Sequence, residues 1–354
     1  MARREQQEPI DTRAWPLAGA VWSRRDLLAA MATMGAAALA PGALAASGPS
    51  RRIIDVHHHM LPTSYVARYR KDLVSWKWSP QSSIDDMDRN GVRMAIVSAI
   101  DPGIWFGDVK QARELARQYN EYGARMVQDY PGRFGFFATL PLPDTEGSLK
   151  EIAYGLDVLK ADGIGLFTDY AGHYLGEPQF APVFDELNRR RAVVYVHPGR
   201  PPCCSTLVPQ VATAIEEYPF DTTRTITSLL YTGTLTRCTN VQFIFSHGGG
   251  TLPFLADRIA SEGRNKKLAA LLPHGPMHEL HRLNFDTASV TNGPAFAALL
   301  KFTSPQHVLF GTDFPWGNAH RTLSGLDSLG LSRATLRDIE YLNALNLFPR
   351  LRRT

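Results

Sequence analysis

Five side chains that can bind a metal ion or transfer a proton stand at the ends of apolar runs in the sequence, namely His57, His59, His197, His247 and Asp313. Imidazole nitrogens and a carboxylate oxygen are ligands that zinc accepts in proteins. An imidazole that is left free of the metal can act as a general acid or base. The residue types therefore predict metal-dependent chemistry with proton transfer, provided that the fold brings these side chains together.

The segment Asp55-Val56-His57-His58-His59 supplies two of the five side chains. Because side chains alternate along a strand, we expect Asp55, His57 and His59 to share one face and His58 to point to the other. Two imidazoles on the same face can then contact one ion. Apolar residues precede the three successive histidines and Met60-Leu61-Pro62 follows them, so they do not resemble an expression tag.

The other three side chains each follow an apolar run and precede a turn or loop. The runs are Val193–His197, Val241–Ser246 before His247, and Val308–Thr312 before Asp313. In a parallel barrel, the carboxyl ends of the strands meet at one rim, which is where barrel enzymes place their chemistry. Five unrelated strand-capping polar residues would require repeated coincidence, and we therefore treat the five as one predicted site.

The elements that must position this site alternate between short apolar runs and longer amphipathic segments. Eight runs predict strands, at Ile53–His59, Met94–Ser98, Phe134–Leu140, Gly163–Phe167, Val193–His197, Val241–Ser246, Asn284–Asp286 and Val308–Thr312. Intervening segments such as Val109–Tyr130, Leu149–Lys160 and Phe180–Arg191 have helical spacing. The pattern predicts a single TIM-type (β/α)8 barrel domain over residues 51–350, with a mononuclear metal site at the C-terminal rim of the strands. A doubly wound open sheet is the structural alternative, but polar residues at several strand ends favour the barrel.

The composition fits a folded domain and excludes some classes of function. The chain has 354 residues, of which 44% are hydrophobic and 20% charged, enough for one large domain or two ordinary ones. The formal charge of +4 is too slight to indicate nucleic-acid binding. No basic stretch is interleaved with aromatic residues, so we expect a small-molecule partner and no nucleic acid.

Residues 1–46 read as a twin-arginine signal peptide. Ser23-Arg24-Arg25-Asp26-Leu27-Leu28 precedes an uncharged, Ala-rich run that contains Ala43-Leu44-Ala45, a cleavage site of the Ala-x-Ala type. A membrane-spanning helix is the alternative, but Pro41 and the high Ala and Gly content weaken it. We expect a periplasmic or secreted protein with no stable membrane span after cleavage. The twin-arginine route carries folded proteins, so a cofactor loaded in the cytoplasm would be retained.

The three cysteines, Cys203, Cys204 and Cys238, do not indicate a disulfide framework. Their odd number leaves at least one thiol unpaired within the chain. A bridge from Cys203 or Cys204 to Cys238 is one arrangement, and small apolar packing residues are the other. No Cys-x-x-Cys spacing suggests a metal site.

Taken in order, Asp-x-His-x-His, Val-His-Pro-Gly, Ser-His-Gly-Gly-Gly and Gly-Thr-Asp-Phe-Pro resemble the amidohydrolase-2 group of the amidohydrolase superfamily, over residues 53–320. This is the group of aminocarboxymuconate-semialdehyde decarboxylase. The segments 55–62 and 78–80 are also similar to 6-methylsalicylate decarboxylases of the fungal type. The resemblance implies one divalent metal ion, zinc or else manganese, cobalt or iron, bound by His57, His59, His197 and Asp313. It further implies that His247 is the acid–base, and Asp313 is the other side chain placed to transfer a proton.

The resemblance implies a metal-dependent decarboxylase, a carbon–carbon lyase of a small hydroxybenzoate- or muconate-type carboxylic acid. The same side chains would serve a hydrolase of a lactone, ester or amide, in which metal-bound water attacks. A non-catalytic periplasmic binding protein is a third interpretation, but the full set of ligands counts against it. In the family, the arginine that Arg258 matches reaches a neighbouring subunit and holds the substrate carboxylate. We therefore expect a homodimer, although Arg258 can also be a surface residue on a helix.

Overall fold

Eight parallel strands form one sheet in the computed structural model, which describes residues 51–353 apart from 202, 205 and 206. The signal peptide predicted at residues 1–46 therefore lies outside the described residues. The strands follow in the order β1 (Ile53–His59), β2 (Val92–Ser98), β3 (Phe134–Thr139), β4 (Gly163–Phe167), β7 (Val193–His197), β8 (Gln242–Phe245), β9 (Asn284–Asp286) and β10 (Val308–Leu309). Each of the eight runs predicted from the sequence corresponds to one of these strands.

The sheet closes between β1 and the segment that follows β10. Val56 N–H donates to the Phe310 carbonyl at 2.9 Å, and His59 N–H donates to the Phe314 carbonyl at 2.8 Å. Asp313 N–H donates to the His57 carbonyl at 2.8 Å. These bonds close the sheet into a TIM-type barrel as predicted. The alternative prediction of an open doubly wound sheet is wrong. Because they join the first and last strands, we call this contact the barrel seam.

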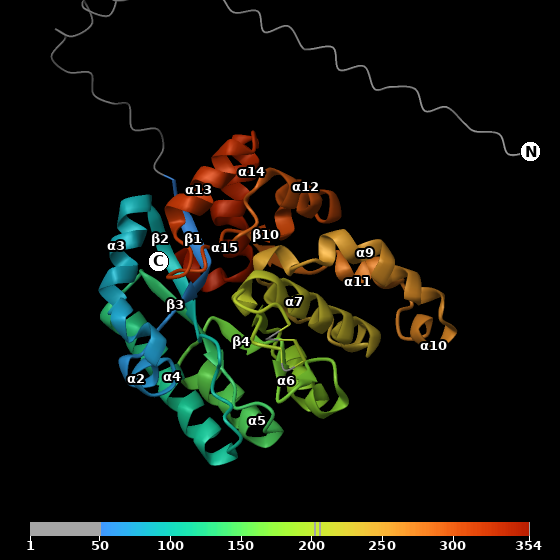
Figure 1. The fold of residues 1–354 in the computed structure, drawn as a ribbon, viewed down its shortest axis with the longest axis horizontal. Coiled ribbons are helices and arrows are strands. Elements are labelled where there is room, and N and C mark those ends of the chain that lie inside the picture. The colour runs from blue at the N-terminus through green and yellow to red at the C-terminus, as the bar shows by residue number, and fades with distance from the viewer. Residues whose placement is uncertain (1–50, 202, 205–206, 354) are drawn as a thin grey trace, which may run out of the picture. The chain divides into compact units, whose positions relative to one another are not determined.

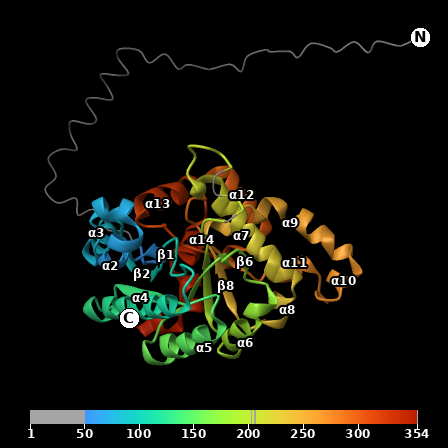
Figure 2. The same cartoon turned by 60° about the horizontal axis from the view of Figure 1, so that its bottom comes forward.

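Helices surround the strands (Figures 1 and 2). The longer ones are α3 (Pro80–Asn90), α4 (Val109–Asp129), α5 (Thr145–Ala153), α6 (Ala181–Arg189), α7 (Thr213–Tyr231), α9 (Leu252–Ala260), α12 (Gly293–Phe302) and α13 (Ala319–Ser328). Shorter helices are α2 (Thr63–Tyr69), α8 (Thr234–Arg237), α10 (Lys266–Ala269), α11 (Pro276–Leu280), α14 (Arg333–Arg337) and α15 (Asn343–Leu347). In the described part of the chain, no helix combines the length and apolar character needed to cross a membrane.

The barrel interior holds its own apolar cluster, separate from the larger core between sheet and helices. Ile54, Val56 and Ile96 belong to it, together with the stacked rings of Phe137 and Tyr195, whose centroids are 5.1 Å apart. Residues of α15 and the following turn close its lower end, where the buried Phe348 contacts Phe137. Because side chains fill the interior, a substrate can bind only at the rim formed by the C-terminal ends of the strands, as in other barrels of this kind.

Two local features differ from the expectations. A small hairpin of β5 (Asp169–Tyr170) and β6 (His173–Tyr174) follows β4 and was not predicted. Along β1 the pairing with β2 shifts register between Asp55 and His58, which is typical of a β-bulge. The regular alternation predicted for this strand is therefore interrupted just before the histidines.

Candidate metal centre

The five predicted side chains lie together at the C-terminal rim of the barrel. Oδ1 of Asp313 lies 3.1 Å from Nε2 of His57 and 3.0 Å from Nε2 of His59. One donor atom from each of His57, His197, His247 and Asp313 can be chosen so that all lie within 4.8 Å of one another. These side chains come from four different strand ends, so the barrel assembles them as the sequence predicted.

Hydrogen bonds on the far side of two rings orient their Nε2 atoms toward the centre. Nδ1 of His59 lies 3.2 Å from the Ala99 carbonyl, and Nδ1 of His197 lies 2.8 Å from the Pro198 carbonyl. A carbonyl can only accept, so each Nδ1 carries the proton and each Nε2 keeps its lone pair. Metal-binding histidines are held in this way.

The donors fit a divalent metal ion. Nε2 of His197 is buried and has no hydrogen-bond partner among the described residues. Nε2 of His57 faces Nε2 of His59 at 3.3 Å, and a cation between these nitrogens would relieve the repulsion of their lone pairs. Three nitrogens and one carboxylate oxygen form a mixed set that suits zinc and related metals. The chain therefore contains a His/Asp site able to bind a metal ion.

Electrostatics also favour positive charge in this site. Burial alone would lower the pKa of His57, but the carboxylates of Asp286 and Asp313 raise it to about 10. Burial would raise the pKa of Asp313, yet His57 holds it well below its usual range. Burial lowers the pKa of His197 well below the ordinary value, with His59 adding to the effect. A metal ion would take the place of the proton that the carboxylates otherwise attract to His57.

Asp286 was not singled out from the sequence, yet it holds His57 in place. Its Oδ2 lies 2.9 Å from Nδ1 of His57, and both side chains are fully buried. The Tyr195 hydroxyl donates to the same oxygen at 3.3 Å. Oδ1 accepts from the backbone N–H of His247 and of Ala288, each at 3.0 Å. Asp286 thus links two of the predicted site residues. Its position at the end of β9 was the available signal.

His247 and Asp313 both have left-handed backbone conformations, with φ of 53° and 62°. This conformation costs a residue other than glycine roughly 1–2 kcal/mol, and such strain is concentrated at functional sites. Nε2 of His247 lies 3.4 Å from Oδ2 of Asp313. His247 is therefore close enough to be a ligand or to exchange a proton at the centre, and the geometry allows both roles.

Asp55 and His58 lie apart from the donor cluster. The prediction that Asp55 shares a face with His57 and His59 is wrong, because the register shift turns its carboxylate toward His58 and Thr312. Oδ2 of Asp55 lies 3.0 Å from Nδ1 of His58 and accepts from the Thr312 hydroxyl at 2.6 Å. Nε2 of His58 lies 2.9 Å from the Ser83 hydroxyl, so the polar groups of His58 have partners outside the cluster. Asp55 therefore stabilises the barrel seam through its hydrogen bonds to Thr312.

The amino-acid sequence is similar to those of known proteins over most of its length. The amidohydrolase family model matches residues 54–350, which is most of the chain. The chain belongs to the amidohydrolase family. It is 37% identical over 325 residues to a decarboxylase of Penicillium terrestre, covering 84% of this chain and 95% of that protein. It is 36% identical over 315 residues to 6-methylsalicylic acid decarboxylase of Penicillium expansum, covering 84% of this chain and 97% of that protein.

Solved structures share the fold of this amidohydrolase. One is a dihydroxybenzoic acid decarboxylase from Polaromonas with bound manganese and the inhibitor 2-nitroresorcinol. Its TM-score is 0.71 and its identity 21%, over 86% of this chain and 98% of that one. At this identity the likeness establishes the fold alone.

Arg258 does not join the metal centre of its own chain. It is an exposed residue on α9, and no hydrogen bond or ion pair connects its side chain to another described residue. Within a single chain, Arg258 therefore does not contact the metal centre. Its predicted role in substrate binding would require the metal centre of a neighbouring subunit.

A buried carboxylate supports the loop that follows His197 in this amidohydrolase. Asp221 on α7 accepts hydrogen bonds from the Thr168 and Tyr174 hydroxyls, the latter at 2.7 Å. The Thr168 hydroxyl also accepts from the Gly199 N–H at 3.2 Å, two residues after His197. α7 thereby fixes the start of the loop that carries one donor of the centre.

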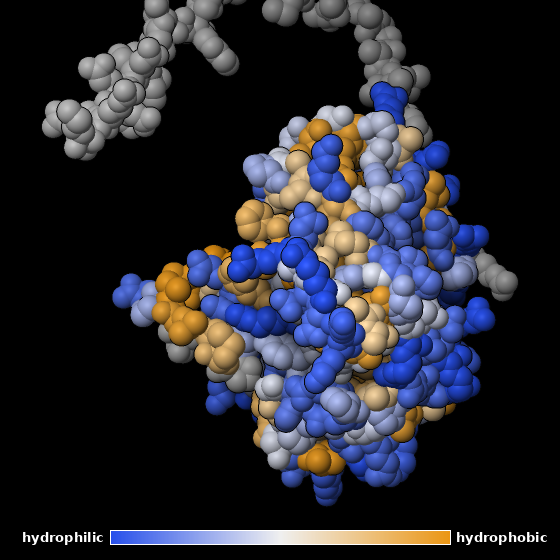
Figure 3. Space-filling view, turned by 90° about the vertical axis from the view of Figure 1, so that its right-hand side faces the viewer, coloured by the Kyte–Doolittle hydropathy of each residue, from blue (hydrophilic) through white to orange (hydrophobic). Residues whose placement is uncertain are grey.

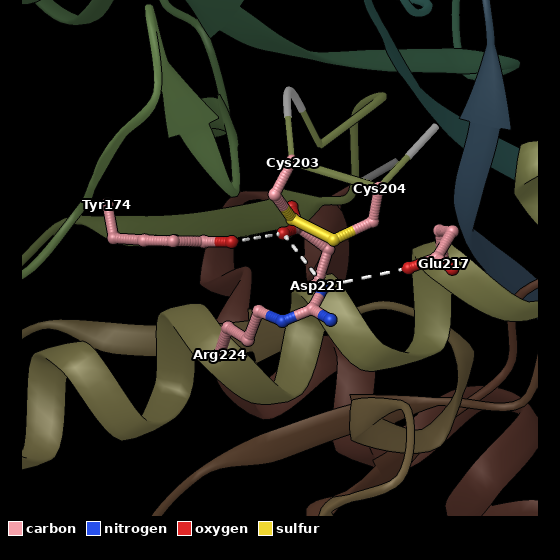
Figure 4. The surroundings of a disulfide bond; sticks show 6 residues. All are labelled: Tyr174, Cys203, Cys204, Glu217, Asp221 and Arg224. Carbon is pink, nitrogen blue, oxygen red and sulfur yellow. Dashed lines mark hydrogen bonds and ion pairs between the residues drawn. A yellow bond between two sulfur atoms is a disulfide. The ribbon is translucent and has the colours of Figure 1, made fainter. Parts of the chain in front are cut away.

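The cysteine pairing differs from the two bridges considered. Cys203 and Cys204 form a disulfide with each other, beside Tyr174, Asp221 and Arg224 (Figure 4). Cys238 is free and fully buried, with its Sγ 3.6 Å from the Phe184 carbonyl. Neither bridge to Cys238 that the sequence left open is formed, because that thiol lies in the core. The small apolar packing role is confirmed for Cys238 and is wrong for Cys203 and Cys204, which are bonded to each other.

Proposed function

We propose that this protein is a metal-dependent decarboxylase of small aromatic or muconate-type carboxylic acids. The observation that carries the proposal is the convergence of three imidazoles and a carboxylate at the barrel rim. The sequence similarity of the chain to decarboxylases, which covers most of its length, favours lyase chemistry. The alternative, hydrolysis of a lactone, ester or amide, uses the same donors but has no such support. A non-catalytic binding protein would not need a strained His247 beside the donors.

In this proposal His57, His59, His197 and Asp313 would hold the metal ion. The ion, when bound, supplies a Lewis acid that stabilises the negative charge developing as carbon dioxide leaves. His247, whose Nε2 lies 3.4 Å from Oδ2 of Asp313, would give a proton to the carbon that loses the carboxylate. Asp286 would keep the His57 ring fixed throughout. Zinc is our first choice for the metal, and manganese, cobalt and iron are alternatives.

Trp316 is the aromatic side chain best placed to contact an aromatic substrate. Its ring centroid lies 5.3 Å from that of His59, and 41% of its surface is exposed. The guanidinium carbon of Arg70 lies 5.9 Å from the centroid of the Trp316 ring. We propose that the substrate ring packs against Trp316, near the positive charge of Arg70.

The experiment that tests this proposal separates carbon dioxide release from addition of water. Purified protein of known metal content would be incubated with 6-methylsalicylate, dihydroxybenzoates, muconate-type acids and lactones. We expect carbon dioxide together with a phenol from each hydroxybenzoate, or an unsaturated acid with one carboxyl group fewer from each muconate-type acid. We expect no activity from metal-free protein. Ring opening of a lactone without carbon dioxide would establish the hydrolase instead. The inactive control is His197→Ala.

We also propose a homodimer in which Arg258 binds the substrate carboxylate of the neighbouring subunit. Apolar side chains are exposed near Arg258, including Phe254 on α9, which is 87% exposed, and Phe220 on α7, which is 43% exposed. Two mainly apolar grooves of about 590 and 440 Å³ share Phe220 and Leu255. Figure 3, which looks onto the side at the right of Figure 1, shows apolar patches among hydrophilic residues. Exposed apolar area of this kind is typical of protein interfaces.

We further propose export through the twin-arginine route to the periplasm or cell exterior. The support is the pair Arg24-Arg25 followed by the Ala-rich run and the Ala-x-Ala site.

A further inference from the structure

A cavity distinct from the two grooves near Phe220 lies away from the metal centre, between α2 and α4. Both views of the ribbon place these helices side by side (Figures 1 and 2). The cavity has a volume of about 330 Å³, at the lower end of the range for small-molecule sites. Four tyrosines and two arginines are among its lining residues, namely Tyr65, Tyr69, Tyr119, Tyr122, Arg68 and Arg125. The five donors of the metal centre are not part of it.

The two arginines in this cavity have no acidic partner. Neither Arg68 nor Arg125 forms an ion pair with any carboxylate in the described residues, although most arginines on the neighbouring elements do. Each guanidinium instead lies near a tyrosine ring, Arg68 at 5.3 Å from Tyr69 and Arg125 at 6.0 Å from Tyr122. Both arginines are exposed at the edge of the cavity, and two cations without an ion-pair partner beside aromatic faces favour an anionic ligand that also carries a ring.

The lining contains one acidic residue, which offsets only one of the two positive charges. Glu121 also borders the cavity, and its Oε1 accepts from the Tyr154 hydroxyl at 3.2 Å. Tyr154 is outside the lining, so this bond draws the carboxylate toward a partner beyond the cavity. The lining keeps an excess of one positive charge.

A buried hydroxyl in the lining is also without a partner. The Tyr69 hydroxyl has no hydrogen bond among the described residues, although it is buried. Its ring is held between Phe106, stacked at 4.4 Å, and Tyr65 at 5.1 Å. A buried hydroxyl without a partner is costly, so a ligand oxygen that accepts from it would be favoured.

We propose that this cavity is a binding site for a small aromatic carboxylate, separate from the metal centre. The ring of the ligand packs among the tyrosines, and its carboxylate lies between Arg68 and Arg125 and accepts from the Tyr69 hydroxyl. A phenol that lacks the carboxylate lacks the group that the arginines recognise. Such a site discriminates between an aromatic acid and its decarboxylated form.

The test is equilibrium dialysis of the metal-loaded protein against benzoate. Wild-type protein is compared with Arg68→Ala/Arg125→Ala and with the matched control Lys71→Ala/Lys110→Ala. The control removes two exposed charges, one from the turn that follows α2 and one from α4, and neither residue lines the cavity. We expect the arginine variant to bind one equivalent of benzoate fewer than wild type, its affinity at this site falling roughly 20-fold or more. The lysine control should bind as wild type does. This difference is measured whether or not the metal centre also binds benzoate, so it is independent of the proposed decarboxylase activity.

A smaller change and two further probes address the chemistry of the ligand. Tyr69→Phe removes only the unpartnered hydroxyl and should weaken benzoate binding about tenfold while the fold is retained. Acetate and phenol, which carry the charge or the ring alone, should each bind at least about tenfold more weakly than benzoate. Equal binding of benzoate to the arginine variant and wild type would overturn the site. Equal binding of acetate or of phenol would overturn the class of ligand.

Discussion

Oδ2 of Asp286 lies 2.9 Å from Nδ1 of His57, and neither side chain is exposed to solvent. This contact fixes the ring of one proposed metal ligand through a residue that is not a ligand itself. We expect Asp286→Asn to lower metal affinity about 10- to 100-fold and activity with it, the usual cost of removing such a support. Metal content at a fixed free-metal concentration is the measurement. Asp327→Asn is the control, because Asp327 is a half-exposed carboxylate on α13 that is not part of the metal centre. Full metal content in the Asp286 variant would contradict the assigned role.

The proposed acid–base and the proposed ligands should respond differently to substitution. His247→Ala should keep near-stoichiometric metal and lose about two to four orders of magnitude in turnover, as expected for a proton-transfer group. His197→Ala should lose metal and activity together. Metal analysis and turnover are measured on both variants. A metal-free His247 variant beside a metal-replete His197 variant would show that the two roles are reversed.

Phe254 tests the proposed dimer. Replacing it with Lys should dissociate the protein, because a charge in an apolar interface is desolvated without a partner. Val158→Lys is the matched control, since Val158 is an exposed apolar residue at 62% on another element. Light scattering gives the mass of both variants and of wild type. A wild-type protein that is monomeric and fully active at low concentration would exclude the dimer and the role of Arg258 within it.

Glu340 should make stability depend on pH. Burial raises its pKa from 4.5 to about 7, against the effect of Arg51, whose Nη2 lies 3.1 Å from Oε1 of Glu340, and with a further rise from Asp327. Because the folded pKa exceeds the unfolded value, this contribution to stability is fully present below pH 4.5 and is lost as the pH rises through about 7. Urea unfolding from pH 4.5 to 8 should show wild type losing about 3 kcal/mol relative to Glu340→Gln. A constant difference between the two proteins over that range would disprove the assignment.

The twin-arginine leader can be tested in cells. Arg24→Lys/Arg25→Lys should retain the precursor inside the cell, whereas the wild-type protein should be exported and cleaved near Ala45 or Ala46. Fractionation and the N-terminal sequence of the exported protein are the measurements. Arg3→Lys/Arg4→Lys, outside the motif, serves as the control. Export of the Arg24/Arg25 variant would mean that the leader is of another kind.

The barrel and most of its metal centre could be predicted because each signal was local. Val193–His197 is an apolar run that ends in a histidine and a turn, and such a run is interpretable without knowledge of distant residues. Asp286 also ends a predicted strand, but this local signal did not indicate its function. Its strand has three residues, and its function depends on a contact with His57 that only the closed barrel creates.

Three other misses have similar physical causes. The hairpin of β5 and β6 consists of two-residue strands, too short for any periodic pattern. The turn of Asp55 toward His58 depends on a register shift, which alternation along one strand cannot reveal. Cys238 was considered as a bridging thiol because sequence gives no measure of burial, and its position in the core removes it from Cys203 and Cys204.

The barrel seam also limits when the chain can first acquire its metal. His57 and His59 leave the ribosome early, whereas Asp313 and the segment that bonds to β1 are synthesised near the end. A nascent or truncated polypeptide has neither the carboxylate donor nor the backbone partner that closes the sheet. The complete set of proposed ligands is therefore present only once synthesis has passed Asp313. Under the twin-arginine export proposed above, the metal ion would be bound before the folded protein leaves the cytoplasm.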